Sequence, residues 1–358
     1  MDSGAELGIG IVGVGGMALW FHVPAVQRTG LARVVALCDV SSAALATAAE
    51  RCPGAQTYSR YEDLLANPAV DAVIIVTSND MHAPVALAAL AAGKHVLCEK
   101  PLALTAVQAQ EMEQAARASG LISGVNFSYR HDPAVRFIAD LLAQGEIGPP
   151  TFLTMHYLQG YLSDPQLPAS WRRQRRHAGS GVLGDLGSHL IDLARYWVGE
   201  ISQVAAHTRT FTAQRPDGHG GMAAVDTDDA FSFACDFATG AMGVLASTGN
   251  ATGHHNHQRV EIYGPLGALI YDNTDQGAIT ALLGQAAARH GLFGRLAVPA
   301  RYRETPDDNV AAFVRGIVAG QPMTPSFTDG LRCQQVLDAA LHSAHSGQRV
   351  AVETGGPH

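Results

Sequence analysis

Short runs rich in valine and isoleucine alternate with alanine-rich stretches of helical length through the first 125 residues. This alternation is typical of parallel strands that are joined by crossover helices. It predicts strands over residues 7–13, 33–38, 71–76, 95–98 and 121–125. It predicts helices over residues 16–29, 42–51, 80–92 and 104–118. Because crossover helices cover both faces of such a sheet, we expect a doubly wound α/β domain over residues 1–125.

The pattern changes after residue 126, where apolar and polar residues alternate along short runs between glycine turns. Such alternation is typical of antiparallel strands with one buried face. It predicts strands over residues 231–237, 241–247, 258–263 and 268–271, and helices over residues 182–198, 308–319 and 328–346. We therefore expect an α+β domain over residues 126–358, with helices on one face of the sheet and the other face open. Residues 275–303 show no clear period and are predicted to form an irregular arm or a mobile loop.

Length and charge limit the classes of function. At 358 residues the chain exceeds what one hydrophobic core usually organises, and roughly 150 residues per domain predicts two domains. A net charge of -8 disfavours nucleic acid or an anionic membrane as a partner, because both attract positive surfaces. We expect a small-molecule partner instead. The open face of the sheet predicts a second copy of the chain as well, in a homodimer or a homotetramer.

Cysteine usage indicates a reducing compartment. The five cysteines are widely spaced and form no Cys-x-x-Cys pair, so we expect reduced thiols and a cytoplasmic protein. The first residues lack the pattern of a signal peptide, and no window approaches the ~20 apolar residues of a membrane span. His255 and His257 share one side of an extended segment, but no carboxylate or cysteine stands at ligand spacing, so we expect no metal site.

A glycine-rich turn follows the first predicted strand, with the sequence Gly13-Val14-Gly15-Gly16-Met17-Ala18. The spacing Gly13-x-Gly15-x-x-Ala18 between a strand and a helix is typical of dinucleotide binding. Gly13 allows the tight turn, Gly15 lets the backbone approach a pyrophosphate, and Ala18 permits close packing of helix on strand. The start of the helix, with Gly16 and Met17, would face the phosphates. A tight turn without a ligand remains an alternative for this motif alone.

Asp39 ends the second predicted strand. An acidic side chain at this place can accept hydrogen bonds from the ribose hydroxyls of a dinucleotide. The next residues, Val40-Ser41-Ser42-Ala43, include no arginine or lysine that would bind a 2′-phosphate. We therefore predict NAD rather than NADP. The alternative role for Asp39 is to cap the helix that follows.

Two further strands end in polar residues. Thr77, Asn79 and His82 follow the strand at 71–76, and Glu99 and Lys100 follow the strand at 95–98. Open α/β sheets bind ligands at the carboxyl ends of their strands. We predict that these five residues contact the cofactor. A loop with a helix cap is the alternative for the segment from Thr77 to His82.

Three residues suggest acid/base chemistry. Lys100 is one of only two lysines, against 22 arginines, and its compact ammonium can stabilise negative charge on a reacting oxygen. Asp185 and His189 are four residues apart in a predicted helix and therefore share a face. Histidine is the most frequent acceptor of a hydroxyl proton. We predict that the three residues act on one substrate, although a pair spaced four apart is often only a structural contact.

In their order, these motifs resemble those of the glucose-fructose oxidoreductase / inositol dehydrogenase / rhizopine catabolism (Gfo/Idh/MocA) family over nearly the whole chain. They are Gly13-x-Gly15-x-x-Ala18, Glu99-Lys100-Pro101 and Gly184-Asp185-x-Gly187-x-His189-x-x-Asp192. The resemblance implies a Rossmann domain that binds NAD(P), an open-faced sheet used for oligomerisation, and Lys100, Asp185 and His189 as the catalytic set. It also implies a cis peptide bond before Pro101.

The pair Trp171-Arg172, followed by Ala178-Gly179-Ser180-Gly181, is most similar to the branch of the family that acts on cyclitols and anhydro-sugars. We expect Trp171 and Arg172 to contact the substrate together with the catalytic set. Tyr129 and Tyr157, with Arg130, could line the same pocket, or they could be core residues. The basic run over residues 172–177 departs from the family, and it would form a solvated loop face or bind an anionic group.

The resemblance implies an NAD-dependent oxidoreductase that transfers a hydride between nicotinamide and a secondary hydroxyl or ketone of a sugar, anhydro-sugar or cyclitol. His189 would accept the proton, Lys100 would bind the reacting oxygen, and Asp185 would anchor the neighbouring hydroxyl. One alternative is a redox-assisted lyase or glycoside-cleaving enzyme that recycles NAD. Another is a regulatory subunit that binds NAD without turnover, which has no need of an acid/base pair.

Overall fold

The computed structural model describes residues 6–275, 277–284, 289–303 and 308–353. The chain divides into two compact units. The first comprises Met1–Ser128 and Asp307–Gln334, and the second comprises Tyr129–Pro306 and Gln335–His358. The first unit therefore combines the N-terminal part of the chain with residues 307–334, so a single boundary at residue 126 does not divide the chain into these two units.

A six-stranded sheet with all strands parallel forms the centre of the first unit. Its order is β3-β2-β1-β4-β5-β6, which is the order of the doubly wound Rossmann fold and confirms the predicted fold class. The strands are β1 (Leu7–Val12), β2 (Ala32–Cys38), β3 (Gln56–Tyr58), β4 (Ala72–Ile75), β5 (His95–Cys98) and β6 (Ser123–Val125). The short strand β3 was not predicted, because three residues show no periodicity.

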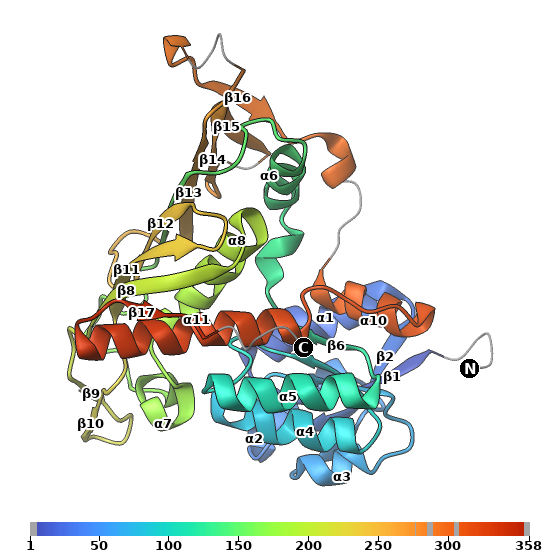
Figure 1. Ribbon diagram of the computed structural model, residues 1–358. Coiled ribbons are helices and arrows are strands. Elements are labelled where there is room, and N and C mark those ends of the chain that lie inside the picture. The colour runs from blue at the N-terminus through green and yellow to red at the C-terminus, as the bar shows by residue number, and fades with distance from the viewer. Residues whose placement is uncertain (1–5, 276, 285–288, 304–307, 354–358) are drawn as a thin grey trace. The chain divides into compact units, whose positions relative to one another are not determined.

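Helices flank this sheet, with α4 and α5 side by side and α1 beside α10 (Figure 1). The hydroxyls of Ser41 and Thr105 accept hydrogen bonds from the first turns of α2 and α5, which fixes where these helices begin. The elements are η1 (Ala18–His22), α1 (Val23–Thr29), α2 (Ser42–Arg51), α3 (Tyr61–Leu65), η2 (Asn79–Met81), α4 (His82–Ala91), α5 (Ala106–Ser119) and α10 (Asn309–Ala319).

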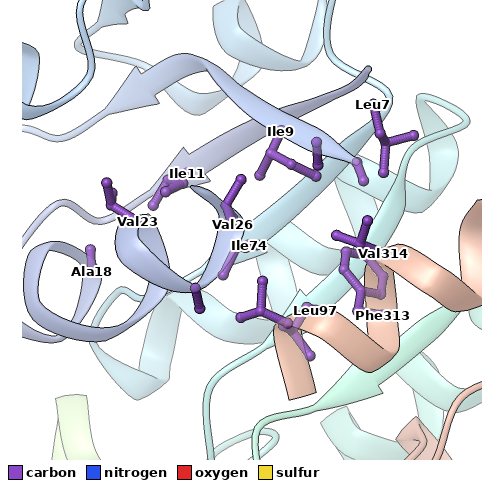
Figure 2. Close-up of a cluster of buried hydrophobic side chains, with 14 of the residues drawn as sticks. Leu7, Ile9, Ile11, Ala18, Val23, Val26, Ile74, Leu97, Phe313 and Val314 are labelled. Atoms are coloured by element: carbon purple, nitrogen blue, oxygen red, sulfur yellow. The ribbon is translucent and has the colours of Figure 1, made fainter. Parts of the chain in front are cut away.

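One buried apolar cluster joins the sheet to α1 and α10, as Figure 2 shows. Alternate residues of β1 supply it, because successive side chains of a strand point to opposite faces. On the other face, a Cβ added to Gly10 would lie 2.7 Å from Cδ2 of Leu64, so glycine lets α3 pack closely there. The labelled members of the cluster are Leu7, Ile9, Ile11, Ala18, Val23, Val26, Ile74, Leu97, Phe313 and Val314.

The helix α10 packs in the first unit. A helix over residues 308–319 was predicted correctly, but its assignment to the antiparallel sheet was wrong. Val310, Phe313, Val314 and Ile317 form an apolar stripe at helical spacing, and all four are buried in the cluster with β1 and α1. The periodicity predicts a helix with one apolar face, but it carries no information on which sheet that face covers.

A nine-stranded sheet forms the centre of the second unit, in the order β16-β15-β14-β13-β7-β12-β11-β8-β17. All neighbouring strands are antiparallel except β7 and β12. The strands are β7 (Phe152–Leu158), β8 (Ile201–Arg209), β11 (Ala230–Phe237), β12 (Met242–Thr248), β13 (His257–Gly264), β14 (Gly267–Asp272), β15 (Ala278–Leu283), β16 (Gly294–Ala297) and β17 (Val350–Ala351). A separate hairpin pairs β9 (Gln214–Pro216) with β10 (Met222–Ala224).

Helices cover one face of this sheet. α6 (Pro133–Ala143) contacts β14, and α8 (Ser188–Val198) contacts β7 and α6 (Figure 1). The other face carries large apolar side chains that are exposed in the single chain, namely Phe152, Met242 and Val244. Buried and accessible residues alternate along β7, β11, β12 and β13, which confirms the predicted open-faced sheet. The remaining elements are η3 (Ser128–His131), η4 (Trp171–Arg173), α7 (Arg175–Ala178), η5 (Leu183–Gly187), η6 (Ala300–Tyr302) and α11 (Phe327–Ser346).

The segment 275–303, predicted to be an irregular arm or a mobile loop, contains two strands. β15 pairs with β14, and β16 pairs with β15, so the segment extends the sheet at one edge. The prediction failed because β15, with the sequence Ala-Ile-Thr-Ala-Leu-Leu, is apolar at five of six positions and therefore shows no alternation with polar residues. Residues 276 and 285–288 lie outside the described part of this segment. In the described chain, all five cysteines are free and buried, and no helix has the length and apolar character that crossing a membrane requires.

Candidate active site

The glycine-rich turn connects β1 to the π-helical turn η1. Gly13 has a φ of 87°, and a Cβ there would lie 2.6 Å from the carbonyl carbon of Val76, so only glycine fits. This contact joins the turn after β1 to the residues after β4. The two loops therefore meet where the strand order reverses, which is where open α/β sheets bind ligands.

Gly15 lies in a different environment. A Cβ added there would meet no atom of the protein within 4 Å, so packing does not require glycine at this position. A molecule that approaches the backbone would require it, and the first turn of the helix presents N–H groups that suit a phosphate. Ala18 is fully buried against the sheet, whereas Met17 is half exposed beside the turn. The turn therefore fits the pyrophosphate of a dinucleotide.

Asp39 supports the same turn. One carboxylate oxygen accepts a hydrogen bond from the Val14 N–H at 2.9 Å, and the other accepts one from the Ser41 N–H at 2.9 Å. The cap of α2 is Ser41, so the alternative role of Asp39 as that cap is wrong. Each carboxylate oxygen has a second lone pair, and Asp39 is only partly buried, so it can also accept from ribose hydroxyls.

The three residues after β4 lie in different environments. Asn79 is buried in η2, and the Thr77 hydroxyl donates to the carbonyl of Ser78 at 3.0 Å. His82 is fully buried, and its Nδ1 lies 2.8 Å from the carbonyl oxygen of Pro101. Burial lowers the pKa of His82, so this imidazole is neutral and Nδ1 donates the bond. His82 thus anchors the turn that contains Lys100.

Glu99 is the centre of a buried polar network in the first unit. Its Oε1 lies 2.8 Å from His22 Nε2 and accepts a hydrogen bond from Asn126 at 2.7 Å, and Oε2 accepts one from the Lys100 N–H at 3.2 Å. Asn126 in turn accepts a hydrogen bond from Asn309 of α10 at 2.9 Å. The network fixes the turn after β5, and its peptide bond between Lys100 and Pro101 is cis, as the family resemblance implied.

Burial alone would raise the pKa of Glu99, but the hydrogen bond and charge of His22, together with Lys100 and Asn126, outweigh it and lower the pKa from 4.5 to about 2. Glu99 therefore stabilises the fold above its ordinary pKa, and this contribution is lost as pH falls towards 2. Glu99→Gln should lower the free energy of unfolding by about 3 kcal/mol at pH 7. In denaturant titrations the difference from the wild type should narrow as pH falls from 4.5 towards 2, because the Glu99 carboxylate of the unfolded chain is protonated in this range while that of the folded protein stays ionised.

Glu113→Gln provides the control for this prediction. Glu113 is a buried glutamate of the same unit, but its neighbours are the Thr328 hydroxyl at 3.2 Å and the exposed Arg117 at 3.8 Å. Its loss should cost less free energy of unfolding, because its partners are one hydroxyl and one exposed guanidinium. An equal destabilisation by Glu99→Gln at every pH would contradict the role of a buried anion.

The second unit contributes Asp185 and His189 from consecutive helical elements. Asp185 lies in the π-helical turn η5, and His189 lies in the first turn of α8. The Tyr161 hydroxyl donates to Oδ2 of Asp185 at 3.3 Å. Burial and the charge of Asp185 raise the pKa of Tyr161, so this hydroxyl stays protonated and donates.

Two tyrosine rings lie near the imidazole of His189, and their hydroxyls bind two side-chain amides. The Tyr129 ring packs edge-on against it with ring centres 4.7 Å apart, and the Tyr157 ring lies 6.4 Å away. The two tyrosine hydroxyls are 2.7 Å apart, and Tyr157 also accepts from Gln159 at 2.9 Å and donates to Asn256. Burial raises the pKa of Tyr157, so this hydroxyl remains neutral. The structure thus places the Tyr129 and Tyr157 rings near His189, and Tyr157 is also a buried residue of the core, at 3% exposure.

Gln159 and Asn256 were not recognised in the sequence. Asn256 stands within the run His254-His255-Asn256-His257, where the histidines drew attention as a possible metal pair. His254 and His257 stack on each other with ring centres 4.9 Å apart, and His257 Nε2 lies 3.3 Å from Asp272 Oδ2. Within the described ranges, no three histidine, cysteine or acidic side chains come together as a metal site would require.

Arg130 and Asp192 form a buried ion pair. Arg130 donates two hydrogen bonds to the Asp192 carboxylate, at 2.9 and 2.6 Å, and Asp192 is 1% exposed. These two hydrogen bonds join residues that are 62 positions apart, so the spacing of residues along α8 could not indicate the pair. The ion pair holds α8, the helix that carries His189.

The basic run differs from one residue to the next. The Arg172 guanidinium stacks at 4.4 Å on the Trp171 ring and is exposed. Arg173 is buried, 3.7 Å from Asp229 and 5.9 Å from the centre of the Tyr161 ring. The expected solvated face therefore holds for Arg172, Arg175 and Arg176, and it is wrong for Arg173.

Comparisons with known proteins agree on one family. A model of the GFO/IDH/MocA oxidoreductase family, with an NAD-binding Rossmann fold, matches residues 7–127. A model of the GFO/IDH/MocA C-terminal domain matches residues 135–270. The first match lies within the first unit and the second match lies within the second unit.

Relatives and solved structures resemble the chain over most of its length. A levoglucosan dehydrogenase from Pseudarthrobacter phenanthrenivorans is 34% identical over 84% of this chain and 84% of its own length. A 1,5-anhydro-D-fructose reductase from Ensifer adhaerens is 31% identical over 97% of this chain and 98% of its own. The structure of a levoglucosan dehydrogenase in complex with NADH and levoglucosan is 31% identical, covers 98% of this chain and 100% of its own, and has a TM-score of 0.91.

Proposed function

Since the chain belongs to the Gfo/Idh/MocA family and is an NAD-binding oxidoreductase that acts on CH–OH groups, we propose that it oxidises a secondary hydroxyl of a sugar, anhydro-sugar or cyclitol. Bound NAD supplies the hydride acceptor. We assign cofactor binding to domain 1–125 and substrate binding to domain 126–358. The named substrates of two relatives, levoglucosan and 1,5-anhydro-D-fructose, favour a neutral cyclic polyol.

One observation carries the proposal on the substrate. Asp185 and His189 stand in one helical segment, and the neighbouring groups are tyrosine hydroxyls and side-chain amides. Such groups donate to and accept from several hydroxyls at once, which suits a polyol. Arg130 and Arg173 lie beside the carboxylates of Asp192 and Asp229, which neutralise their charges and leave them less suited to bind an acid substrate.

The catalytic roles follow from the chemistry of three side chains. His189 accepts the proton of the reacting hydroxyl, Lys100 donates a hydrogen bond to that oxygen and stabilises its negative charge, and Asp185 binds a neighbouring hydroxyl. Trp171 and Arg172 contribute an apolar face and a hydrogen-bond donor to the substrate. Tyr129 and Tyr157 hold the imidazole in place. The cofactor contacts come from Gly13, Gly15, Gly16, Met17, Asp39, Thr77, Asn79, Glu99 and Lys100. The predicted contacts of Ala18 and His82 are replaced by indirect roles, because both residues are fully buried: Ala18 packs the helix on the sheet, and His82 acts through the Pro101 carbonyl.

The direct test is to incubate the protein with NAD and a panel of sugars, anhydro-sugars and cyclitols, and to measure NADH absorbance. We expect NADH to accumulate with one or more neutral polyols. Product without net NADH would instead support a lyase or glycoside-cleaving enzyme that recycles the cofactor. Binding of NAD without turnover of any compound would support a regulatory subunit.

We also propose a homodimer or homotetramer in the cytoplasm. The exposed Phe152, Met242 and Val244 lie on the helix-free face of the nine-stranded sheet. Large apolar side chains gathered on one face favour contact with a second copy of the chain. The five free thiols fit a reducing compartment. The oligomeric state can be measured by light scattering.

A further inference from the structure

Three consecutive amides begin the helical segment that carries Asp185 and His189, and all three bind one residue. The Gly181 and Leu183 N–H groups donate to the two carboxylate oxygens of Asp228, each at 2.7 Å. The Val182 N–H donates to the backbone carbonyl of Asp228 at 3.0 Å. A helix start leaves its first N–H groups without partners inside the helix, so Asp228 supplies these partners from 45 and 47 residues away.

The same contact explains why residue 181 is glycine. A Cβ at Gly181 would lie 1.9 Å from the carbonyl oxygen of Asp228, far inside contact distance. Gly181 has no other steric reason to be glycine, since its φ lies outside the positive range. The backbones of Gly181 and Asp228 therefore lie in close contact, and Asp228 defines the position of residues 181–183.

One backbone hydrogen bond links Gly181 to Asp185. The Asp185 N–H donates to the Gly181 carbonyl at 2.9 Å, so the backbone of Asp185 follows that of Gly181. Asp228 is itself fixed, because the next residue, Asp229, accepts hydrogen bonds from Phe211 and Thr212 at 2.7 and 3.0 Å. Asp228 lies two residues before β11 and is 7% exposed.

We propose that Asp228 is a positioning residue, which holds the backbone of residues 181–183 so that Asp185 and His189 stand at the correct place for the reaction. The proposal rests on the proposed function of these two residues. Small displacements of catalytic groups lower the rate of the chemical step more than they lower cofactor binding. Asp228 should therefore act on kcat without touching the substrate.

The test compares Asp228→Asn with Asp217→Asn. Asparagine keeps the shape of the side chain but turns one oxygen into an NH₂ group, which opposes a backbone N–H donor. Asp217 is a matched control, because its carboxylate also accepts two backbone N–H bonds, from His219 and Gly221 at 2.7 and 2.9 Å, in an exposed loop. We expect D228N to lower kcat roughly 10- to 100-fold with little change in NADH affinity, and D217N to leave both unchanged.

A second variant keeps the Asp228 carboxylate intact. Gly181→Ala should push the same backbone away and lower kcat in the same way, and the double variant should lose less than the product of the two single effects. Gly181→Ala also tests the positioning role of Asp228 if D228N does not fold. A normal kcat in folded G181A or D228N would overturn the proposal.

Amide hydrogen exchange separates this proposal from the proposed function. D228N should accelerate exchange in a peptide that covers residues 181–189 and leave the remainder of the second unit at the wild-type rate. If D228N exchanges faster in residues 181–189 but the wild type oxidises no polyol, the positioning role of Asp228 is supported and the proposed function is rejected. If exchange in residues 181–189 is unchanged in D228N, the positioning role of Asp228 is rejected, whatever the activity of the wild type.

Discussion

Lys100→Ala should lower turnover about 100-fold or more, while NADH still binds. Lys100 ends the turn after β5, where Glu99 accepts its backbone N–H and His82 binds the carbonyl of the next residue. A backbone fixed in this way delivers the ammonium to one place. Without it, the oxygen of the reacting alcohol loses the charge that stabilises its anionic form. Stopped-flow measurement of hydride transfer and fluorescence titration with NADH would separate the two effects.

Lys94 is the matched control, because it is the only other lysine. Its ammonium donates to the Val70 carbonyl at 2.7 Å, in the same unit. Lys94→Ala should keep normal turnover. Lys100→Arg should rescue little activity, because a planar guanidinium does not place one donor where the compact ammonium stands. Full turnover in Lys100→Ala would refute the assignment of this residue.

The first unit was predictable from the sequence because its signals are local. Each buried parallel strand is a short apolar run, and the features of the cofactor turn fall within six residues at Gly13-x-Gly15-x-x-Ala18. Asp39 follows from its place at the end of β2. Its hydrogen bond to the Val14 N–H was not predicted, because it joins two loops that are 25 residues apart.

The second unit was less predictable because its important contacts are long-range. The spacing of Asp185 and His189 is visible in the sequence, but their supports are not. Asp228 holds Gly181 from 47 residues away, and Asn256 binds Tyr157 from 99 residues away. Asp192 illustrates the same difficulty, since its ion pair with Arg130 joins residues that are 62 positions apart. Local periodicity can indicate which face of a helix is functional, but not which distant residue binds it.

His189→Asn should lower kcat/KM for polyol oxidation about 100-fold or more near neutral pH, because the proton acceptor is lost. The pH profile gives a sharper test than the rate itself. In the wild type, oxidation should slow as pH falls, since a protonated imidazole cannot accept a proton. In the reverse direction the same imidazole must donate, so reduction should slow as pH rises. Both dependences should disappear in the variant.

The variant retains a small polar side chain beside the Tyr129 ring, which limits the disturbance to packing. His342→Asn is the control, because His342 is an exposed histidine of α11 in the same unit. It should leave both pH profiles unchanged. If His189→Asn kept the wild-type profile at a lower rate, another group would accept the proton. The neighbouring tyrosines are poor candidates, since burial raises the pKa of Tyr157 and of Tyr161. Asp185 would then be the acceptor, and the role of His189 would be to position it.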